Sequence, residues 1–304
     1  MDLTRLRTLQ ELAIRRTMAA VADALRLSPS AVSQQIAQLE IDVGVPLIER
    51  RGRGVRLTAA GERLRVHTDR ILAVLEEART DLAELRNQVG GEVRVATFPS
   101  VGAALLPAVV RKVQAAHPAL QVSLLEFEPD EGVAAVRAWQ ADTAIIDDMT
   151  ISAELAGGNL ETVPLLQDRL YALLPRDHRL CRQRHVSLAE LRDESWAIDS
   201  SRRSYAQRLI QLCEAAGFSP RVNAQCASFV IMAAMVESGC SVSVTPGLHL
   251  RWLRGRLVAR PLRPALPRAI FAVHRRGERR NPALNAVLAE LQRQAKDLLP
   301  PRTA

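Results

Sequence analysis

Residues 28 to 40, SPSAVSQQIAQLE, predict an amphipathic helix with an uncharged polar face. Ser28 can cap this helix, and Pro29 suits its first turn, where a backbone N–H is not needed. Val32, Ile36 and Leu39 recur at spacings of four and three, which places them on one narrow apolar stripe. A helix that only faces solvent usually carries charges on its other face. This one carries hydroxyls and amides, at Ser30, Ser33, Gln34, Gln35 and Gln38.

Two helices are predicted before this one. An apolar rhythm predicts the first over residues 3 to 12, and residues 19 to 25 predict the second, which ends in a short turn before Ser28. Two short helices joined by a tight turn form a helix-turn-helix, whose second helix enters the major groove of DNA. Hydroxyls and amides can contact phosphates and base edges, whereas carboxylates would be repelled. The predicted DNA-contacting residues of this helix are Ser28, Pro29, Ser30, Ser33, Gln34, Gln35 and Gln38.

A short hairpin is predicted downstream, with residues 46 to 49 pairing with residues 55 to 57 around the turn RRGRG. The glycines allow the turn, and Arg50, Arg51 and Arg53 lie where a wing would touch the phosphate backbone. Taken alone, the arginine run could equally be a solvated surface turn. Because the polar helix precedes it, we favour the interpretation that the arginine run binds DNA.

Residues 19 to 64 closely resemble the winged helix-turn-helix of LysR-type transcriptional regulators, in one register over about forty-five residues. The matching features are Ala19-Ala20, Ala24-Leu25, Ser33, Ile36, Leu39-Glu40, Gly44-Val45-Pro46-Leu47, Arg50 and Leu57-Thr58-x-Ala60-Gly61. Two positions depart from the family pattern. Pro29 stands where many members have Gln, which removes any base contact from that position, and Ile48 replaces the usual Phe.

A long helix without proline is predicted to follow, from residue 58 to residue 89, and Gly90-Gly91 is expected to end it. Apolar residues four and three apart form one heptad seam, while most other positions are charged. A helix lying on the core of its own domain is the alternative, but only this narrow stripe needs burial. We therefore predict a dimer, with two recognition helices side by side for a two-fold site. The seam consists of Leu64, Ile71, Leu75, Ala78, Leu82, Leu85 and Val89, with Thr68 between the first two.

Strand and helix patterns alternate in the last two thirds of the chain, which predicts a parallel α/β sheet covered by helices. The resemblance to LysR-type regulators implies a periplasmic-binding-protein-like effector domain of two subdomains, which the chain crosses twice. The predicted organisation is a winged helix-turn-helix over 1–60, a dimerisation helix over 61–90 and an effector-binding domain over 91–304. Its first subdomain comprises 91–163 and 266–304, and its second 164–265.

Ligands of open α/β sheets bind at the carboxyl ends of strands, near helix N-termini. We expect Ser100 to cap a helix there, and the family resemblance implies that it meets an effector carboxylate. Glu126, Glu128, Asp147 and Asp199 suggest a pocket for an amine or guanidinium, although exposed acidic loops are an equal alternative. The predicted effector-binding residues are Phe98, Pro99, Ser100, Val101, Phe127, Asp147, Asp199, Ser200, Ser201, Arg202, Thr245 and Pro246.

Composition narrows the function classes. The net charge of +8 is compatible with an anionic partner. Ten arginines and one acid lie between Arg251 and Arg280. We interpret this segment as a solvated face or a subunit contact, with a second nucleic-acid surface as the alternative.

The six histidines lack ligand spacing, and neither a P-loop nor a G-x-S-x-G motif occurs, so no metal site, cofactor or enzymatic activity is predicted. The absence of a signal peptide and of a long apolar run predicts a cytoplasmic protein without a membrane span.

The predicted partners are double-stranded DNA, a small-molecule effector and further copies of the chain. The family resemblance suggests a homotetramer formed through the effector domains, and RNA polymerase is a further candidate partner. A thiol redox switch that uses Cys213, Cys226 or Cys240 is the alternative to effector binding, because some LysR-type proteins sense oxidants. Such a switch needs an accessible cysteine of low pKa with a resolving partner.

Overall fold

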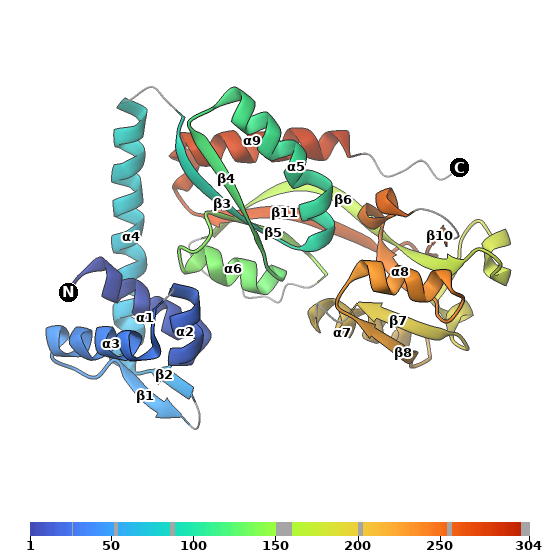
Figure 1. Cartoon of the computed structure of the whole chain (residues 1–304), viewed down its shortest axis with the longest axis horizontal. Coiled ribbons are helices and arrows are strands. Elements are labelled where there is room, and N and C mark those ends of the chain that lie inside the picture. The colour runs from blue at the N-terminus through green and yellow to red at the C-terminus, as the bar shows by residue number, and fades with distance from the viewer. Residues whose placement is uncertain are drawn as a thin grey trace.

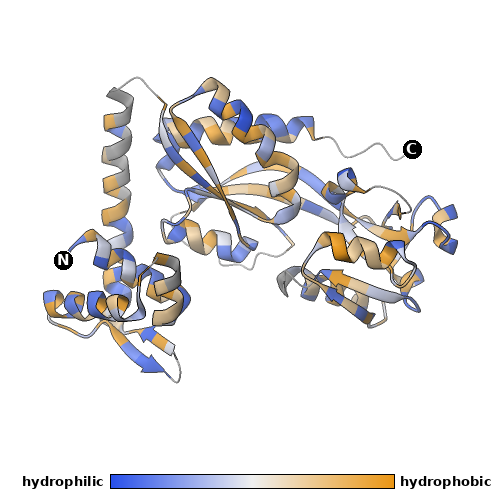
Figure 2. Cartoon of the chain, viewed as in Figure 1, coloured by the Kyte–Doolittle hydropathy of each residue, from blue (hydrophilic) through white to orange (hydrophobic). Residues whose placement is uncertain are grey.

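The computed structural model describes residues 1–25, 27–51, 54–85, 89–149, 160–199, 203–253 and 257–298. A small helical unit lies at one end of a long helix, and an elongated α/β domain follows (Figure 1). Most helices carry hydrophilic and hydrophobic residues side by side, as expected for helices that bury one face (Figure 2).

The N-terminal unit consists of α1 (Leu3–Arg15), α2 (Met18–Leu25), α3 (Pro29–Val43), β1 (Ile48–Arg51) and β2 (Gly54–Leu57). Its core contains the apolar stripe of α3 together with leucines of α1, and Leu47 and Leu57 join it from either side of the hairpin. The strands β1 and β2 are antiparallel, with Ile48 opposite Leu57. The winged helix-turn-helix is thus present. The first strand of its hairpin begins at residue 48, two residues later than the predicted start at residue 46.

The long helix α4 (Ala59–Leu85) is shorter than the predicted 61–90 segment. Residues 86–88 lie outside the described part of the chain, and Val89 follows them in irregular backbone. Val89 packs against the core of the effector domain, so it is not a member of a helical seam. Leu64, at the other end of the predicted seam, packs against the core of the N-terminal unit.

The central sheet of the α/β domain has the strand order β10-β6-β11-β5-β3-β4, with β9 also paired to β6. Its strands are β3 (Gly91–Thr97), β4 (Leu120–Glu126), β5 (Thr143–Asp147), β6 (Leu160–Pro175), β9 (Ser243–Pro246), β10 (Leu257–Pro261) and β11 (Pro267–Arg275). The prediction of a parallel sheet was wrong for most of it. Only β3, β4 and β5 are parallel to one another, whereas β6, β9, β10 and β11 pair antiparallel. The strand β10 was not predicted.

The long strands β6 and β11 connect the two subdomains of this domain. They pair from Pro267 opposite Arg169 to Arg275 opposite Leu160, with an irregularity between Ile270 and Phe271. Both predicted crossings therefore belong to one continuous antiparallel ribbon.

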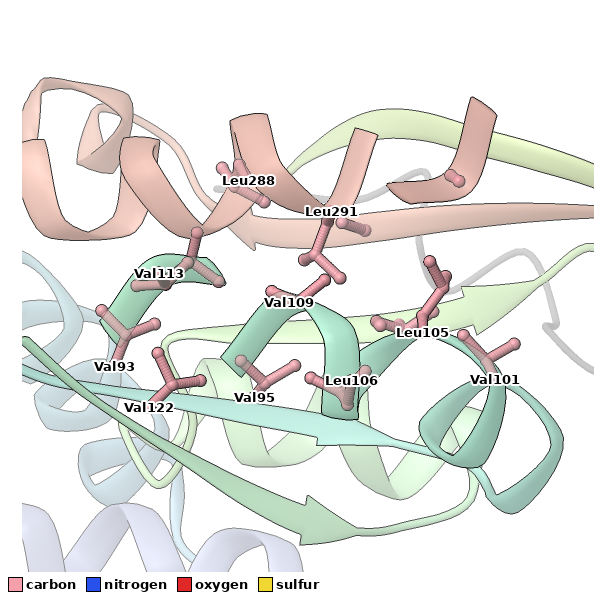
Figure 3. Close-up of a cluster of buried hydrophobic side chains, with 14 of the residues drawn as sticks. Val93, Val95, Val101, Leu105, Leu106, Val109, Val113, Val122, Leu288 and Leu291 are labelled. Carbon is pink, nitrogen blue, oxygen red and sulfur yellow. The ribbon is translucent and has the colours of Figure 1, made fainter. Parts of the chain in front are cut away.

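The first subdomain packs α5 (Pro99–Ala116), α6 (Pro129–Arg137) and α9 (Pro282–Asp297) around β3, β4 and β5. Its largest core lies between α5, α9 and the strands, and Val95, Val109 and Leu291 are all fully buried there (Figure 3). Burial of a side chain of this size contributes about 1.5–3 kcal/mol.

The second subdomain contains the parallel pair β7 (Ser195–Asp199) and β8 (Arg221–Cys226) with α7 (Arg203–Ala215) and α8 (Phe229–Glu237). Short 3-10 turns complete the fold: η2 (Arg179–Arg182), η3 (Leu188–Leu191), η4 (Gly247–Trp252) and η5 (Glu278–Arg280). Trp196 is fully buried in this core, and its indole N–H donates to the carbonyl of Leu191 at 3.1 Å.

Candidate DNA-binding and effector-binding sites

Helix α3 presents its polar face to solvent, as predicted. The Ser28 hydroxyl accepts a hydrogen bond from the Ala31 amide at 3.1 Å, which caps the helix. Ser30, Ser33 and Gln34 are exposed. The stripe on the opposite side is buried, so the core holds α3 in one rotational setting.

The two other glutamines of α3 have partners inside the N-terminal unit. The buried Thr8 hydroxyl of α1 donates to Gln35 Oε1 at 2.5 Å. Gln38 Nε2 donates to Asp42 Oδ1 at 3.3 Å. Four predicted DNA-contacting residues follow the first turn of α3: Ser33, Gln34, Gln35 and Gln38. Since Gln35 and Gln38 have partners within the unit, Ser33 and Gln34 are the best placed to meet base edges.

The wing is fixed by contacts on both sides. Glu40 Oε1 accepts from the amides of Leu47 at 2.7 Å and Ile48 at 3.2 Å. The Val55 amide donates to the carbonyl of Arg16 at 2.7 Å, which ties β2 to the end of α1.

Exposed arginines surround this wing. Arg50 and Arg51 are exposed on β1, while Arg53 lies outside the described residues. A cavity of about 640 Å³ beside the hairpin is lined by Arg16, Arg51 and Arg56 among other residues. Sequence reasoning missed Arg16, because the turn that follows α1 meets the wing only in the folded unit, and it omitted Arg56, which lies on β2 of the hairpin itself.

The middle of α4 exposes apolar side chains. Ile71 is 41% exposed and Leu82 63%, whereas Leu75 is half-buried. Ala78 is exposed, and the side chain of Leu85 lies outside the described part of the chain. Val74, which the seam omitted, is also 63% exposed. An exposed apolar stripe of this kind suits a partner helix.

A fully buried arginine, Arg268, brings several predicted effector residues together. Its Nε donates to Asp147 Oδ2 at 2.8 Å, and its Nη1 lies 3.4 Å from the Ser100 hydroxyl. The guanidinium also lies 4.6 Å from the centre of the Phe98 ring. Sequence reasoning missed Arg268 by treating residues 251 to 280 as a solvated face. An arginine at the start of the apolar strand RAIFAVH was the available signal.

The cap of helix α5 lies two residues before the predicted cap Ser100, and this changes the role of Ser100. Phe98 is the N-cap residue and Pro99 the first helical residue. The hydroxyl of Ser100 therefore does not cap the helix, and the side chain is fully buried. Val101 is buried in the core of the first subdomain, while Pro99 is exposed.

The same arginine reaches the second subdomain. Its Nη1 lies 3.8 Å from Asp168 Oδ2, and Asp168 in turn accepts from the Leu248 amide at 3.5 Å. Burial raises the pKa of the Asp168 carboxyl, although Arg268 opposes that shift. Leu248 lies just beyond Thr245 and Pro246, so this chain of contacts joins them to the group around Ser100.

The remaining predicted effector residues are less closely connected. The Phe127 amide donates to the carbonyl of Thr97 at 3.1 Å, which keeps the end of β4 beside the start of α5. Asp199 ends β7 and is half-buried. Ser200, Ser201 and Arg202 lie outside the described residues. Asp147 is already paired with Arg268, so it is not available to an amine ligand as the sequence suggested.

Three of the four cysteines lie in surroundings that disfavour the thiolate, whereas Cys240 is exposed. Burial raises the pKa of Cys213 to about 12 and also raises the pKa of Cys181 and Cys226. Thiols with a raised pKa are poor nucleophiles at neutral pH. Among the described residues, no group of three or more His, Cys, Asp or Glu side chains could hold a metal ion, and no helix there is long and apolar enough to span a membrane.

Comparison with known proteins matches both parts of the chain. Residues 3–62 match the family model of bacterial regulatory helix-turn-helix proteins of the lysR family, and residues 86–296 match the LysR substrate binding domain. The transcriptional dual regulator GltC of Bacillus subtilis is 28% identical over 246 residues, which cover 81% of each chain. The regulator IlvY of Escherichia coli is 36% identical over 147 residues, 48% of this chain and 49% of its own.

Solved structures show the same fold. Full-length OxyR C199D from Pseudomonas aeruginosa aligns with a TM-score of 0.66 and 24% identity, over 96% of this chain and 98% of its own. CbnR, solved in complex with its target DNA, aligns with a TM-score of 0.55 and 24% identity, over 97% and 100% of the two chains.

The fold and the polar helix define a DNA-binding regulator that joins a winged helix-turn-helix to a two-subdomain domain like those of periplasmic binding proteins. The chain belongs to the LysR family of bacterial transcriptional regulators. It is thus a DNA-binding regulator with an effector-binding domain, and its curated relatives are transcriptional regulators rather than enzymes.

Proposed function

We propose that a small molecule bound where the two subdomains meet changes how this regulator binds and bends its operator. The DNA-binding part of the proposal is supported by the exposed polar face of α3. Burial of the apolar stripe on the other side of α3 keeps this face in solvent, and the arginine-lined wing lies beside it. Side chains that reach base edges specify sequence, while phosphate contacts fix register.

A pair of variants tests this division of roles. Gln34→Ala should weaken binding to the operator by about 1–3 kcal/mol while leaving binding to unrelated DNA unchanged. Ser33→Ala should behave in the same way if its hydroxyl meets a base. Arg51→Ala is the matched control, because a lost phosphate contact weakens binding to all sequences and reduces the salt slope by about one unit.

The intergenic region beside the regulator's own gene is the fragment to footprint. Unchanged operator preference in the Gln34→Ala protein would remove Gln34 from sequence recognition.

We also propose that the protein acts as a dimer through α4, and that effector domains associate further into a tetramer. The support for the dimer is the exposed stripe in the middle of α4, at Ile71, Val74 and Leu82. Contacts with RNA polymerase from the DNA-bound oligomer belong to the same proposal. Analytical ultracentrifugation across protein concentration measures both assembly steps.

The effector site is proposed around the first turn of α5, Phe98 to Val101, with Thr245 and Pro246 facing it from the second subdomain. The support is the chain of contacts through Arg268 and Asp168 described above. Ser100→Ala should weaken effector binding by about 1 kcal/mol or more through a lost hydrogen bond. Calorimetry with a panel of metabolites checks this prediction. Equal affinity of the wild-type and Ser100→Ala proteins for the effector would show that Ser100 only packs in the core and does not bind the effector.

Asp199→Asn tests the opposite side of the proposed site. If the effector carries an amine or guanidinium at that end, the variant should lose affinity for cationic metabolites and keep its affinity for simple carboxylates. The same calorimetric panel distinguishes the two outcomes. Equal selectivity in both proteins would remove Asp199 from the site.

A further inference from the structure

The DNA-binding unit contacts the effector domain of its own chain at the C-terminal end of α6. Arg15 of α1 donates from Nη2 to Gln140 Oε1 at 3.0 Å. A cavity of about 280 Å³ separates the two parts and is lined by α1, α4 and α6, including Ile14, Asp69 and Arg137. Helix α4 also contacts η5 and α9 of the effector domain. In Figure 1, α6 lies beside the N-terminal unit.

Charges on the two sides of this contact are complementary. Burial raises the pKa of the Asp69 carboxyl on α4. Arg65 and Gln10 of the same unit oppose that shift most, and Arg137 and Arg275 of the effector domain oppose it from across the contact. On α1, Glu11 forms an ion pair with Arg15 at 2.8 Å, and Arg15 continues the chain of contacts to Gln140.

The contact is polar and incompletely satisfied, which distinguishes it from a permanent core. Gln10 and Glu11 are at most 2% exposed, yet Gln10 Oε1 and Glu11 Oε1 accept no hydrogen bond from any described residue. A buried polar atom without a partner destabilises the contact that buries it. Such a surface can separate with less loss than an apolar interface of the same size.

Both ends of α6 are anchored to elements of the proposed effector site. At its N-terminus, the preceding Phe127 amide is bonded to Thr97, immediately before the start of α5. At its C-terminus, the Arg275 guanidinium stacks 3.8 Å from the centre of the Trp139 ring and donates to the carbonyls of Val136 and Ala141.

Arg275 belongs to the same strand, β11, as the buried Arg268. β11 is therefore connected through Arg275 to the end of α6 that meets the DNA-binding unit, while the start of α5 is connected to the other end of α6.

We propose that the C-terminal end of α6, from Arg137 to Gln140, is the docking surface for the chain's own DNA-binding unit, and that its engagement sets the orientation of α3 on DNA. This proposal rests on the proposed function for its regulatory meaning. The docking itself is a property of the free protein and can be measured without DNA or effector.

Hydrogen–deuterium exchange of the full-length protein tests the docking. Arg137→Glu reverses the charge that faces Asp69, so exchange in α1, residues 3–15, should rise by about three- to tenfold although the substitution is on α6. Arg137→Lys should keep the protection. Arg111→Glu is the matched control, because Arg111 is exposed on α5 away from this contact.

Arg15→Ala tests the contact from the other side, and exchange should rise in residues 129–140. If each substitution raised exchange only in the helix that carries it, and left exchange in the helix on the other side of the contact unchanged, the docking proposal would be overturned.

DNA bending tests the regulatory part. On the footprinted intergenic fragment, Arg137→Glu should keep its affinity within about threefold but change the bend angle measured by circular-permutation gel shifts, and an unchanged bend would overturn that part. If wild-type protein failed to bind the fragment, the proposed function would fall, while the exchange comparison would still decide whether the docking exists.

Discussion

Arg268 offers the sharpest test of how the effector domain is held together. Both Arg268 and Asp147 are fully buried, and the Arg268 Nη2 lies 2.7 Å from Asp147 Oδ2. Removing one member of a buried ion pair costs about 3–5 kcal/mol, because the remaining charge stays buried without its counter-ion. Arg268→Met keeps an apolar stem of similar length and leaves Asp147 without its guanidinium. We expect the free energy of unfolding of the effector domain to fall by that amount.

Differential scanning calorimetry of the full-length protein measures this loss. For a domain of this size, 1 kcal/mol corresponds to about 2–4 °C in melting temperature, so the expected decrease is about 6–20 °C. Arg276→Met is the matched control, because Arg276 lies in the turn directly after the same strand. Arg276 is 65% exposed and 3.7 Å from Glu161, and exposed pairs of this kind contribute at most about 1 kcal/mol.

A second substitution separates the unpaired charge from lost packing. Adding Asp147→Asn to Arg268→Met removes the buried negative charge, and it should restore a large part of the lost stability. If Arg268→Met melted within about 2 °C of the Arg276→Met protein, Asp147 would not be an unpaired buried charge, and the reasoning from burial would be refuted.

Three further outcomes are expected. Gly61→Ala should destabilise the DNA-binding unit by at least about 1–3 kcal/mol, measured by thermal circular dichroism, because an added Cβ would lie 2.2 Å from the Leu47 carbonyl oxygen. Leu82→Asp should shift the protein to monomer in the ultracentrifuge by placing a charge in the α4 contact, and an intact dimer would place that contact elsewhere. Burial raises the pKa of Glu11 above its ordinary 4.5, so the folded state binds that proton more tightly than the unfolded chain and stability falls as pH rises from about 4.5 through the raised pKa. Glu11→Gln should remove that decline in urea unfolding measured across pH, whereas parallel curves would show that Glu11 does not titrate in this way.

The DNA-binding unit could be predicted closely because its signals are local. The cap at Ser28, the proline that follows and the stripe through Ile36 each depend on residues within one or two helical turns. The structure moves the predicted boundaries there by only a few residues. The roles of Gln35 and Arg16 could not be predicted, since their partners lie on other elements of the unit.

The effector domain was predicted less well because its determining contacts are distant in sequence. Alternating strands and helices correctly indicated α/β layers. Nothing local, however, shows that residue 275 pairs antiparallel with residue 160. The burial of Arg268 has the same origin: its partners are Asp147, 121 residues away, and Ser100, 168 residues away. Charged residues are mostly exposed, so sequence reasoning placed this one at the surface.

The two ends of α4 explain how dimerisation could act on both parts of the chain. Leu64 packs into the core of the DNA-binding unit, and Val89, just beyond the helix, packs into the effector core. A helix of 27 residues spans about 40 Å, so these anchors leave its middle free for a partner. Pairing through that middle would fix the separation of two recognition helices. The docking of each DNA-binding unit on α6 would then fix its rotation about the α4 axis. The proposed mechanism needs both quantities defined: the middle of α4 sets the separation, and the contact of the DNA-binding unit with α6 sets the rotation.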